Sequence, residues 1–304
     1  MQIYRHRFSI MLLLVFLSLA PRITFAVENS IQIAFLEDSC VSGRTNSYST
    51  IVRLAFYWQD SAWKSFDHTV RNSQELGIAA TKFAGTIKWV LAAHDRSLGA
   101  VTSKGVEKYR KYKDVGMQEL VSTLPAAAKT SRDLTYAGSP GCPVRKPMVL
   151  STARPKSDKE RWAKVKATIK PSREMAEKIR SSADDRYAGD DNKPVNAAFT
   201  EKDLLVAVQY RSPVKGDLIA LQVRPDARTK DAMGNPDKRM HWFYVDKNKA
   251  DTFIGHGLVL IDWADYNSDA GTEFLFWVDG YNSNGYLITW ADFSRSDAFT
   301  WTYH

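Results

Sequence analysis

Short runs of β-branched and aromatic residues, separated by turn-forming residues, recur along most of the chain. Runs of about four to eight such residues, bounded by Gly, Asn, Asp, Ser or Pro, are typical of strands joined in hairpins. Many short strands at close spacing favour an antiparallel sandwich, barrel or propeller. The predicted strands are 31–36, 50–58, 63–66, 85–93, 98–102, 204–210, 218–223, 241–245, 257–262, 273–278 and 286–290. The pattern therefore predicts a mainly β protein.

One stretch breaks this pattern, because it is rich in Lys, Glu, Ala and Met. Ser157 and Glu160 have the spacing of a capping box, which marks the start of a helix. Pro171 divides the stretch, and proline fits a helix start better than a helix interior. A small two-helix insertion at about 157–183 is expected, either within one β domain or between two β halves. Its predicted parts are helices at 158–170 and 171–182, followed by a polar linker at about 184–199.

The first 26 residues have the organisation of a cleavable secretory signal peptide. Arg5 and Arg7 precede an almost wholly apolar segment, 8–20, and small residues, Thr24 and Ala26, stand three positions and one position before a plausible cleavage point. Basic, apolar and small-residue regions in this order are typical of such signals. The alternative is an uncleaved anchor, although a spanning helix needs about 20 apolar residues. We therefore expect a secreted or periplasmic protein whose mature part is a mainly β domain at 27–304, without a transmembrane segment.

The chain has two cysteines, Cys40 and Cys142, and both fall in Ser-, Gly- and Pro-rich segments that are typical of loops. An oxidising compartment would allow them to form a disulfide bond. The alternative is a pair of free thiols. Neither cysteine has a second Cys or a His at the spacing of a zinc site, so the sequence does not favour zinc there.

The chain carries a modest positive charge. Its formal charge of +8 falls to +5 after signal cleavage, because three arginines and no acid are removed. The surplus of Lys and Arg collects between 104 and 180. This region could meet an anionic envelope polysaccharide, lipid or protein, or it could be only a solvated face. Nucleic acid is not an expected partner, because no recognised binding motif accompanies the charge.

An acidic loop near the C-terminus carries the clearest chemical signal. Between two apolar runs, oxygen-bearing side chains alternate with other residues. Calcium takes six to eight oxygen ligands, and alternating side chains of a tight loop can converge on one ion. An EF-hand is excluded, because Phe276 occupies the position of its final Glu. The candidate metal site comprises Asp265, Asn267, Asp269, Gly271 and Glu273.

The segment 257–286 resembles the calcium loop of FG-GAP/VCBS-type repeats, which are blades of integrin-α-like β-propellers. The resemblance implies that the loop binds a structural calcium ion and that 250–304 forms one propeller-like blade. Two residues depart from the repeat pattern, since Ala270 replaces a glycine and Glu273 replaces the last aspartate. No second clean copy is found, whereas true repeat proteins show several units. The propeller is therefore expected to have incomplete or degenerate blades.

Other interpretations of the same region stay open. The loop could be an ordinary polar hairpin turn, since Asp, Asn, Ser and Gly favour turns without an ion. Asp262, Asp265 and Glu273 could serve a glycan-directed envelope hydrolase as paired carboxylates. Nearby aromatic residues could stack on carbohydrate, although most aromatics in sheets are buried. These are Trp263, Tyr266, Trp277, Tyr281, Tyr286 and Trp290.

No specific catalytic motif occurs in the sequence, and its catalytic residues, if it has any, stay unknown. There is no nucleophile elbow, phosphate loop or dinucleotide fingerprint. The histidines are scattered, and only His256 is suggestive, because glycines on both sides let a backbone approach a ligand closely. We expect an exported binding or interaction module with an unknown ligand. A hydrolase and a structural envelope protein are the alternatives.

Overall fold

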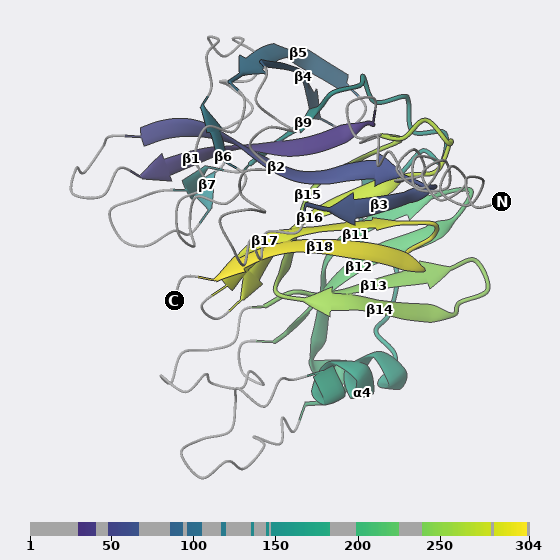
Figure 1. Cartoon of the computed structure of the whole chain (residues 1–304). Helices are drawn as coiled ribbons and strands as arrows, with labels where there is room; N and C mark the ends of the chain where they lie inside the picture. The colour runs from purple at the N-terminus through teal and green to yellow at the C-terminus, as the bar shows by residue number, and fades with distance from the viewer. Residues whose placement is uncertain are drawn as a thin grey trace, which may run out of the picture. The chain divides into compact units, whose positions relative to one another are not determined.

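The structure is a computed structural model, and it is mainly antiparallel β. Three sheets and a two-stranded ribbon, β7 (Thr135–Tyr136) with β8 (Val144–Arg145), form among the residues that it describes, and none of the sheets closes into a barrel (Figure 1). The described residues are 30–40, 48–66, 86–93, 96–104, 117–119, 135–136, 144–145, 147–182, 199–224, 239–280 and 283–302.

The first sheet is built from the N-terminal strands. Its strand order is β3-β2-β1-β9-β4-β5, with the short β6 also paired to β2. The β2–β3 hairpin turns through Asp60 and Ser61, which both have the positive φ angles that favour a tight two-residue turn. The strands are β1 (Gln32–Cys40), β2 (Tyr48–Gln59), β3 (Ala62–Ser65), β4 (Ile87–Ala93), β5 (Arg96–Ser103), β6 (Met117–Glu119) and β9 (Met148–Ser151).

The second and third sheets are meanders, in which each strand pairs with the next one in sequence. The second sheet contains β10 (Ala163–Val165), β11 (Leu204–Ser212), β12 (Gly216–Val223), β13 (His241–Asp246) and β14 (Asp251–His256). The third sheet contains β15 (Leu258–Ala264), β16 (Glu273–Gly280), β17 (Ser283–Trp290) and β18 (Arg295–Thr302). A 3₁₀ turn, η2 (Glu201–Asp203), precedes β11. The four-stranded meander thus begins at 258, and β14 belongs to the preceding sheet.

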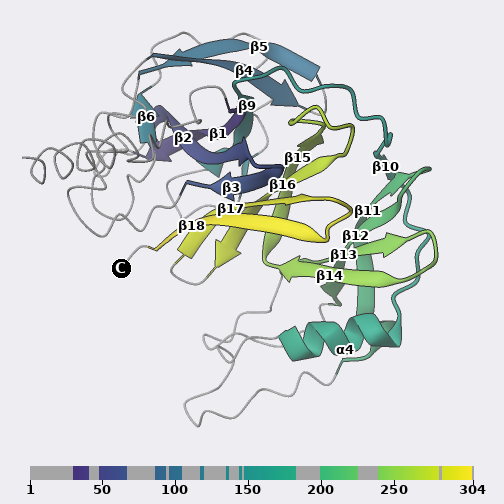
Figure 2. The same ribbon diagram turned by 45° about the vertical axis from the view of Figure 1, so that its right-hand side comes forward.

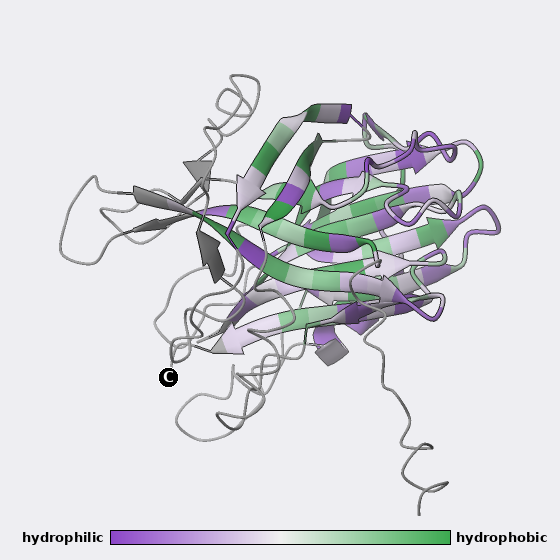
Figure 3. Ribbon diagram, turned by 45° about the horizontal axis from the view of Figure 1, so that its top comes forward, coloured by the Kyte–Doolittle hydropathy of each residue, from purple (hydrophilic) through white to green (hydrophobic). Residues whose placement is uncertain are grey.

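The third sheet is buried on both faces. On one face Leu275 and Ile288 pack with Phe35 and Trp63 of the first sheet. On the other face, Phe276 and its neighbours pack against Leu218, Trp242 and other residues of the second sheet. Figure 2 shows β15–β18 between the strands of the first sheet and those of the second. Burial on both faces explains why β15 and β16 are almost continuously apolar in sequence, without the alternation expected of a half-exposed strand. Hydrophobic bands accordingly run along the strands between hydrophilic ones, and the turns at one end of the sheets are mostly hydrophilic (Figure 3).

The helix α4 (Arg173–Ser182) covers the opposite face of the second sheet. Its buried residues Met175, Ala176 and Ile179 pack with residues of β12 and β13, among them Ile219 and Phe243. The helix is capped by Ser172, whose hydroxyl oxygen accepts a hydrogen bond from the backbone N–H of Met175 at 3.1 Å.

The predicted helix at 158–170 is wrong, because this segment is irregular apart from β10. Asp158 accepts hydrogen bonds from the backbone N–H groups of Glu160 and Trp162, which folds the chain into a tight polar turn. Arg161 has a φ of 55°, and Trp162 is buried between sheets. Packing of Trp162 therefore overrides the helical composition, and only the second predicted helix, near α4, forms.

The predicted strands all appear, with ends shifted by up to about four residues, as is usual for boundaries taken from sequence. The sequence interpretation missed β6, β7, β8, β9, β10, β14 and β18. The predicted signal peptide, most of the polar linker and Cys142 lie outside the described residues, as does the side chain of Cys40, so the disulfide bond stays a prediction. Within the described part of the chain, no helix has the length and apolar character needed to cross a membrane.

Candidate functional site

The acidic loop, residues 265–273, connects β15 to β16 and is held by a distant segment of the chain. The backbone N–H of Lys156 donates to the carbonyl oxygen of Asp265 at 2.9 Å. The hydroxyl of Thr272 donates to Oδ1 of Asp158, also at 2.9 Å. The loop is therefore fixed at both ends by residues 156–158, which lie more than 100 positions earlier in the sequence.

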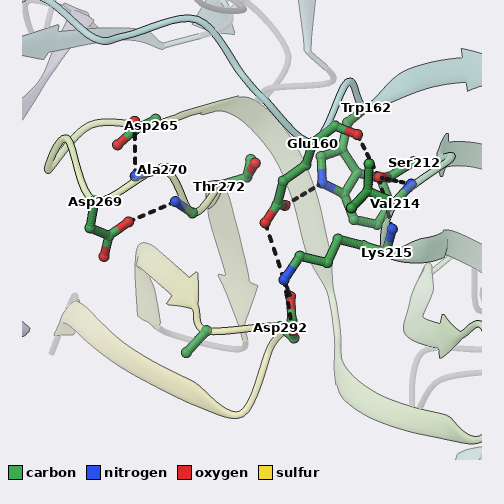
Figure 4. A network of polar contacts seen from close by, with 12 residues as sticks. Glu160, Trp162, Ser212, Val214, Lys215, Asp265, Asp269, Ala270, Thr272 and Asp292 are labelled. Carbon is green, nitrogen blue, oxygen red and sulfur yellow. Dashed lines mark hydrogen bonds and ion pairs between the residues drawn. The ribbon is translucent and has the colours of Figure 1, made fainter.

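Inside the loop, polar side chains bond to one another and to the backbone. Oδ1 of Asn267 accepts a hydrogen bond from the N–H of Asp269, and the Asn267 amide donates to Oδ2 of Asp269. Oδ1 of Asp269 accepts a hydrogen bond from the N–H of Gly271 at 2.7 Å (Figure 4). Ser268 and Ala270 have positive φ angles of 69° and 75°. These bonds are those of a well-formed polar turn, so Asn267, Asp269 and Gly271 are explained by turn formation even without an ion.

Asp265 differs from the other loop residues, because it is almost completely buried. Its exposed fraction is 1%. Its Oδ2 accepts a hydrogen bond from the N–H of Ala270 at 3.1 Å, whereas its Oδ1 has no partner among the described groups. Burial raises the pKa of the Asp265 carboxyl, and the nearby charge of Asp269 raises it further. A buried carboxylate oxygen without a hydrogen bond lowers the stability of the fold. A bound proton or cation would remove this cost.

Glu273 points into the core between the first and third sheets. Its Oε1 accepts a hydrogen bond from the indole Nε1–H of Trp63 at 3.1 Å, and its Oε2 accepts one from the backbone N–H of Tyr266 at 2.8 Å. Burial raises the pKa of Glu273 from 4.5 to about 8, against the opposing effect of these two bonds. The charges of Asp269 and Asp265 add to the increase. Glu273 thus prefers to be protonated at neutral pH.

A further buried acid, Asp262, is linked to Glu273 through Tyr266. The hydroxyl of Tyr266 donates to Oδ2 of Asp262 at 2.7 Å. Burial, and then the charge of Asp262, raises the pKa of the Tyr266 phenol well above its ordinary value. The exposed fractions of Asp262, Asp265 and Glu273 are 2%, 1% and 1%. A glycosidase acid or nucleophile must touch its substrate, and carboxyls buried to this degree do not reach one.

The structure brings the predicted ligands together only in part. Asp265, Asn267 and Asp269 lie on one turn, but the bonds of Glu273 run toward Trp63 and Tyr266. Within the described residues, no three His, Cys, Asp or Glu side chains are grouped closely enough to hold a metal. A calcium ion could use the free Oδ1 of Asp265 and the outer lone pairs of Asp269, and backbone carbonyls or water would have to complete its shell.

The aromatic residues of this region do not form an exposed stacking face. Of those described, Trp263, Tyr266, Tyr286 and Trp290 are buried, and Trp277 is partly buried against the same core. Tyr281 lies outside the described residues. Burial in the two interfaces of the third sheet explains the abundance of aromatics, as expected for most aromatics in sheets.

Sequence reasoning missed a second polar network next to the acidic loop (Figure 4). The ammonium of Lys215 contacts Oδ1 of Asp292 at 2.8 Å and Oε1 of Glu160 at 3.3 Å. The indole N–H of Trp162 donates to Oε2 of Glu160 at 2.9 Å. The network joins the β11–β12 turn, the β17–β18 turn and the segment before β10. Its members are so far apart in sequence that no local spacing could have indicated them.

The chain was compared with protein-family models, curated proteins and solved structures, and nothing matches it. The FG-GAP/VCBS resemblance therefore stays a prediction that rests on residues 257–286. The function must be argued from the geometry of the chain itself.

Proposed function

We propose that this chain is an exported binding module and that its acidic loop binds one calcium ion with a structural role. In this proposal the meander β15–β18 is a propeller-like blade, and the loop between its first two strands is stiffened by the ion. The ligand of the module would be an envelope polysaccharide or protein, met by surface loops. The meander connectivity and the face-to-face packing of the third sheet support the blade interpretation.

The observation that carries the cation proposal is the unpartnered Oδ1 of Asp265. The atom is buried, and no described group donates a hydrogen bond to it. It lies in a loop where the nearby Asp269 adds negative charge, and burial raises the pKa of the Asp265 carboxyl. A divalent cation would neutralise this repulsion and satisfy the free oxygen at once. Asp265 and Asp269 would hold it, while Glu273 stays bonded to Trp63 and Tyr266 inside the fold.

The same geometry disfavours the hydrolase alternative. General acid–base catalysis requires a carboxyl within hydrogen-bond reach of the substrate. The three acids that would do this work are buried, and Glu273 and Asp262 are bonded to Trp63 and Tyr266 inside the fold. The pKa values of Glu273 and Asp265 are raised because both carboxyls are buried in the fold. A catalytic role is not needed to explain them.

Thermal unfolding of the exported protein tests the calcium proposal. The protein is first freed of metal with EDTA and then titrated with calcium. A single site in the native state adds about 2.7 kcal/mol at a calcium concentration 100 times Kd, so the melting temperature should rise and saturate.

Two variants locate the site. Asp265→Asn should abolish most of the calcium-dependent rise, whereas Glu177→Gln removes an exposed carboxylate from α4 and should leave it unchanged. A melting temperature that ignores calcium would refute the cation site. An equal rise in the wild type and in Asp265→Asn would place the ion elsewhere.

A further inference from the structure

His241 and His256 lie directly opposite each other on neighbouring strands. They are register partners in the antiparallel pair β13–β14, and their ring centroids are 6.1 Å apart. Cβ atoms of directly opposed residues are about 4.5–5.5 Å apart, so the two side chains share one face of the sheet. His241 is buried, with 4% of its surface exposed, and His256 is partly buried. The two imidazoles thus form a close pair at the end of the β13–β14 ladder.

The backbone around the pair is held in place on both strands. The N–H of Gly257 donates to the carbonyl oxygen of Met240 at 3.1 Å, which closes the ladder just beyond the two histidines. Gly257 has a φ of 65°, and a Cβ there would lie 2.6 Å from the carbonyl oxygen of Asp279. A glycine is therefore required at this position by its conformation and by the close approach of β16. His256 is set against His241 by a constrained backbone.

We propose that His241 and His256 together bind a divalent transition-metal ion of the zinc, copper or nickel class. Imidazole nitrogen suits these ions, and metal–nitrogen bonds are about 2.0–2.1 Å long. Two imidazoles on one metal with a bond angle near tetrahedral have ring centroids about 5 Å apart. The observed pair needs a side-chain rotation that brings the centroids together by only about 1 Å, and rotation about χ1 or χ2 can supply it.

The site is open, with two side chains from the described residues as its ligands. No group of three ligating acids, cysteines or histidines occurs in the described part of the chain, so water or a bound molecule fills the other positions. Four protein ligands are typical of a structural zinc site, whereas open positions allow an ion to be shared with a ligand. The site is also chemically distinct from the acidic loop, because calcium takes oxygen ligands. It does not depend on the calcium proposal.

Titration calorimetry with zinc chloride tests the proposal on the exported protein, after EDTA treatment and without reductant. One equivalent of zinc should bind at pH 7.5, with much weaker binding at pH 5, because protons compete for the imidazole nitrogens. His256→Gln and His241→Gln should each lower the affinity by about tenfold or more. The double variant should bind zinc about as weakly as the weaker of the two single variants. The two losses should not add, because both histidines hold the same ion.

His94→Gln is the control, because it removes a histidine that does not belong to the proposed pair. The zinc affinity of this variant should equal that of the wild type. His241→Gln could disturb the fold, since His241 is buried, so the argument depends first on the more accessible His256→Gln. A separate readout is the electron paramagnetic resonance spectrum of bound copper, which should show two imidazole nitrogens. Full zinc affinity in His256→Gln, or a copper spectrum without imidazole nitrogen, would overturn the proposal.

Discussion

The indole N–H of Trp63 donates a hydrogen bond to Oε1 of Glu273, which lies 210 residues later in the sequence. The bond joins β3 of the first sheet to the start of β16 in the third sheet. It places a carboxyl group next to Trp63, in an apolar interface to which Leu275 and Trp290 also belong. The same contact both links the two sheets and creates a buried group whose protonation affects stability.

Glu273 should make the protein less stable as the pH rises from about 4.5 to 8. Its pKa is about 8 in the folded protein and 4.5 ordinarily, so in this interval the folded state retains a proton that the unfolded state has lost. The free energy of unfolding therefore falls with increasing pH, on the order of a few kcal/mol in total, and levels off above pH 8. Urea unfolding at several pH values in EDTA measures this change.

Glu273→Gln should remove this fall, because glutamine does not titrate. Its amide cannot accept the bond from Tyr266 N–H while accepting the one from Trp63, so it should be destabilised at acidic pH by about 1–3 kcal/mol. Glu177→Gln, on the exposed face of α4, should keep the pH dependence of the wild type. If Glu273→Gln kept the same slope between pH 5 and 8, Glu273 would not be the titrating group.

Lys215→Met should destabilise the protein by about 2–4 kcal/mol, because it leaves Glu160 as a largely buried charge without its cation. Arg173→Met is the matched control, since it removes a cation from an exposed pair on α4 and should cost less than about 0.5 kcal/mol. Urea denaturation provides both values. Equal losses in the two variants would mean that the Lys215 network does not stabilise the contact between the second and third sheets.

Ala291→Gly should stabilise the protein by up to about 1 kcal/mol, since a left-handed conformation is costly for residues other than glycine. Three consecutive residues of the β17–β18 turn are left-handed, with φ angles of 51° at Ala291, 57° at Asp292 and 64° at Phe293. Ala298→Gly, in the neighbouring strand β18, should instead destabilise by about 0.5–1 kcal/mol. Thermal unfolding measures both changes in stability. A gain in Ala291→Gly together with a loss in Ala298→Gly would confirm that the left-handed conformation of Ala291 is strained. A loss in both variants would contradict it.

Gly285→Ala should destabilise the protein severely, by more than about 3 kcal/mol, since overpacking against backbone cannot be relieved by a side-chain rotation. A Cβ at Gly285 would lie 2.3 Å from the carbonyl oxygen of Phe299, on the paired strand β18. Thr300→Ala changes an exposed neighbour and should have little effect. A normal melting temperature for Gly285→Ala would show that β17 and β18 can separate at this point.

The strands could be predicted from sequence, because their apolar runs are set by burial. Two of the missed strands carried a weaker signal: in β18 only Phe299 and Trp301 are buried among exposed residues, and β14 is interrupted by Gly255. The helix predicted at 158–170 failed because Trp162 is drawn into the core between sheets. Local propensity does not record such a long-range contact.

The acidic loop could be located from sequence, but its geometry could not. The alternation of acids predicted a calcium loop, with an ordinary polar turn as the alternative; the polar turn is present, and the ion stays a proposal. Nothing in the spacing indicated that Asp158 would bond to Thr272, or that Glu273 would accept a bond from Trp63. Both contacts join segments separated by more than 100 residues, so they depend on how the sheets stack.

The position of the third sheet has a consequence for biogenesis. Residues 258–302 are synthesised after both sheets that flank them, yet they form the layer between those sheets. Until this last segment arrives, the inner faces of the first and second sheets have no cover, and such apolar surfaces are prone to aggregate. Final assembly must therefore follow completion of the chain. If the chain is exported unfolded, as we propose, a chaperone would have to cover these faces during passage.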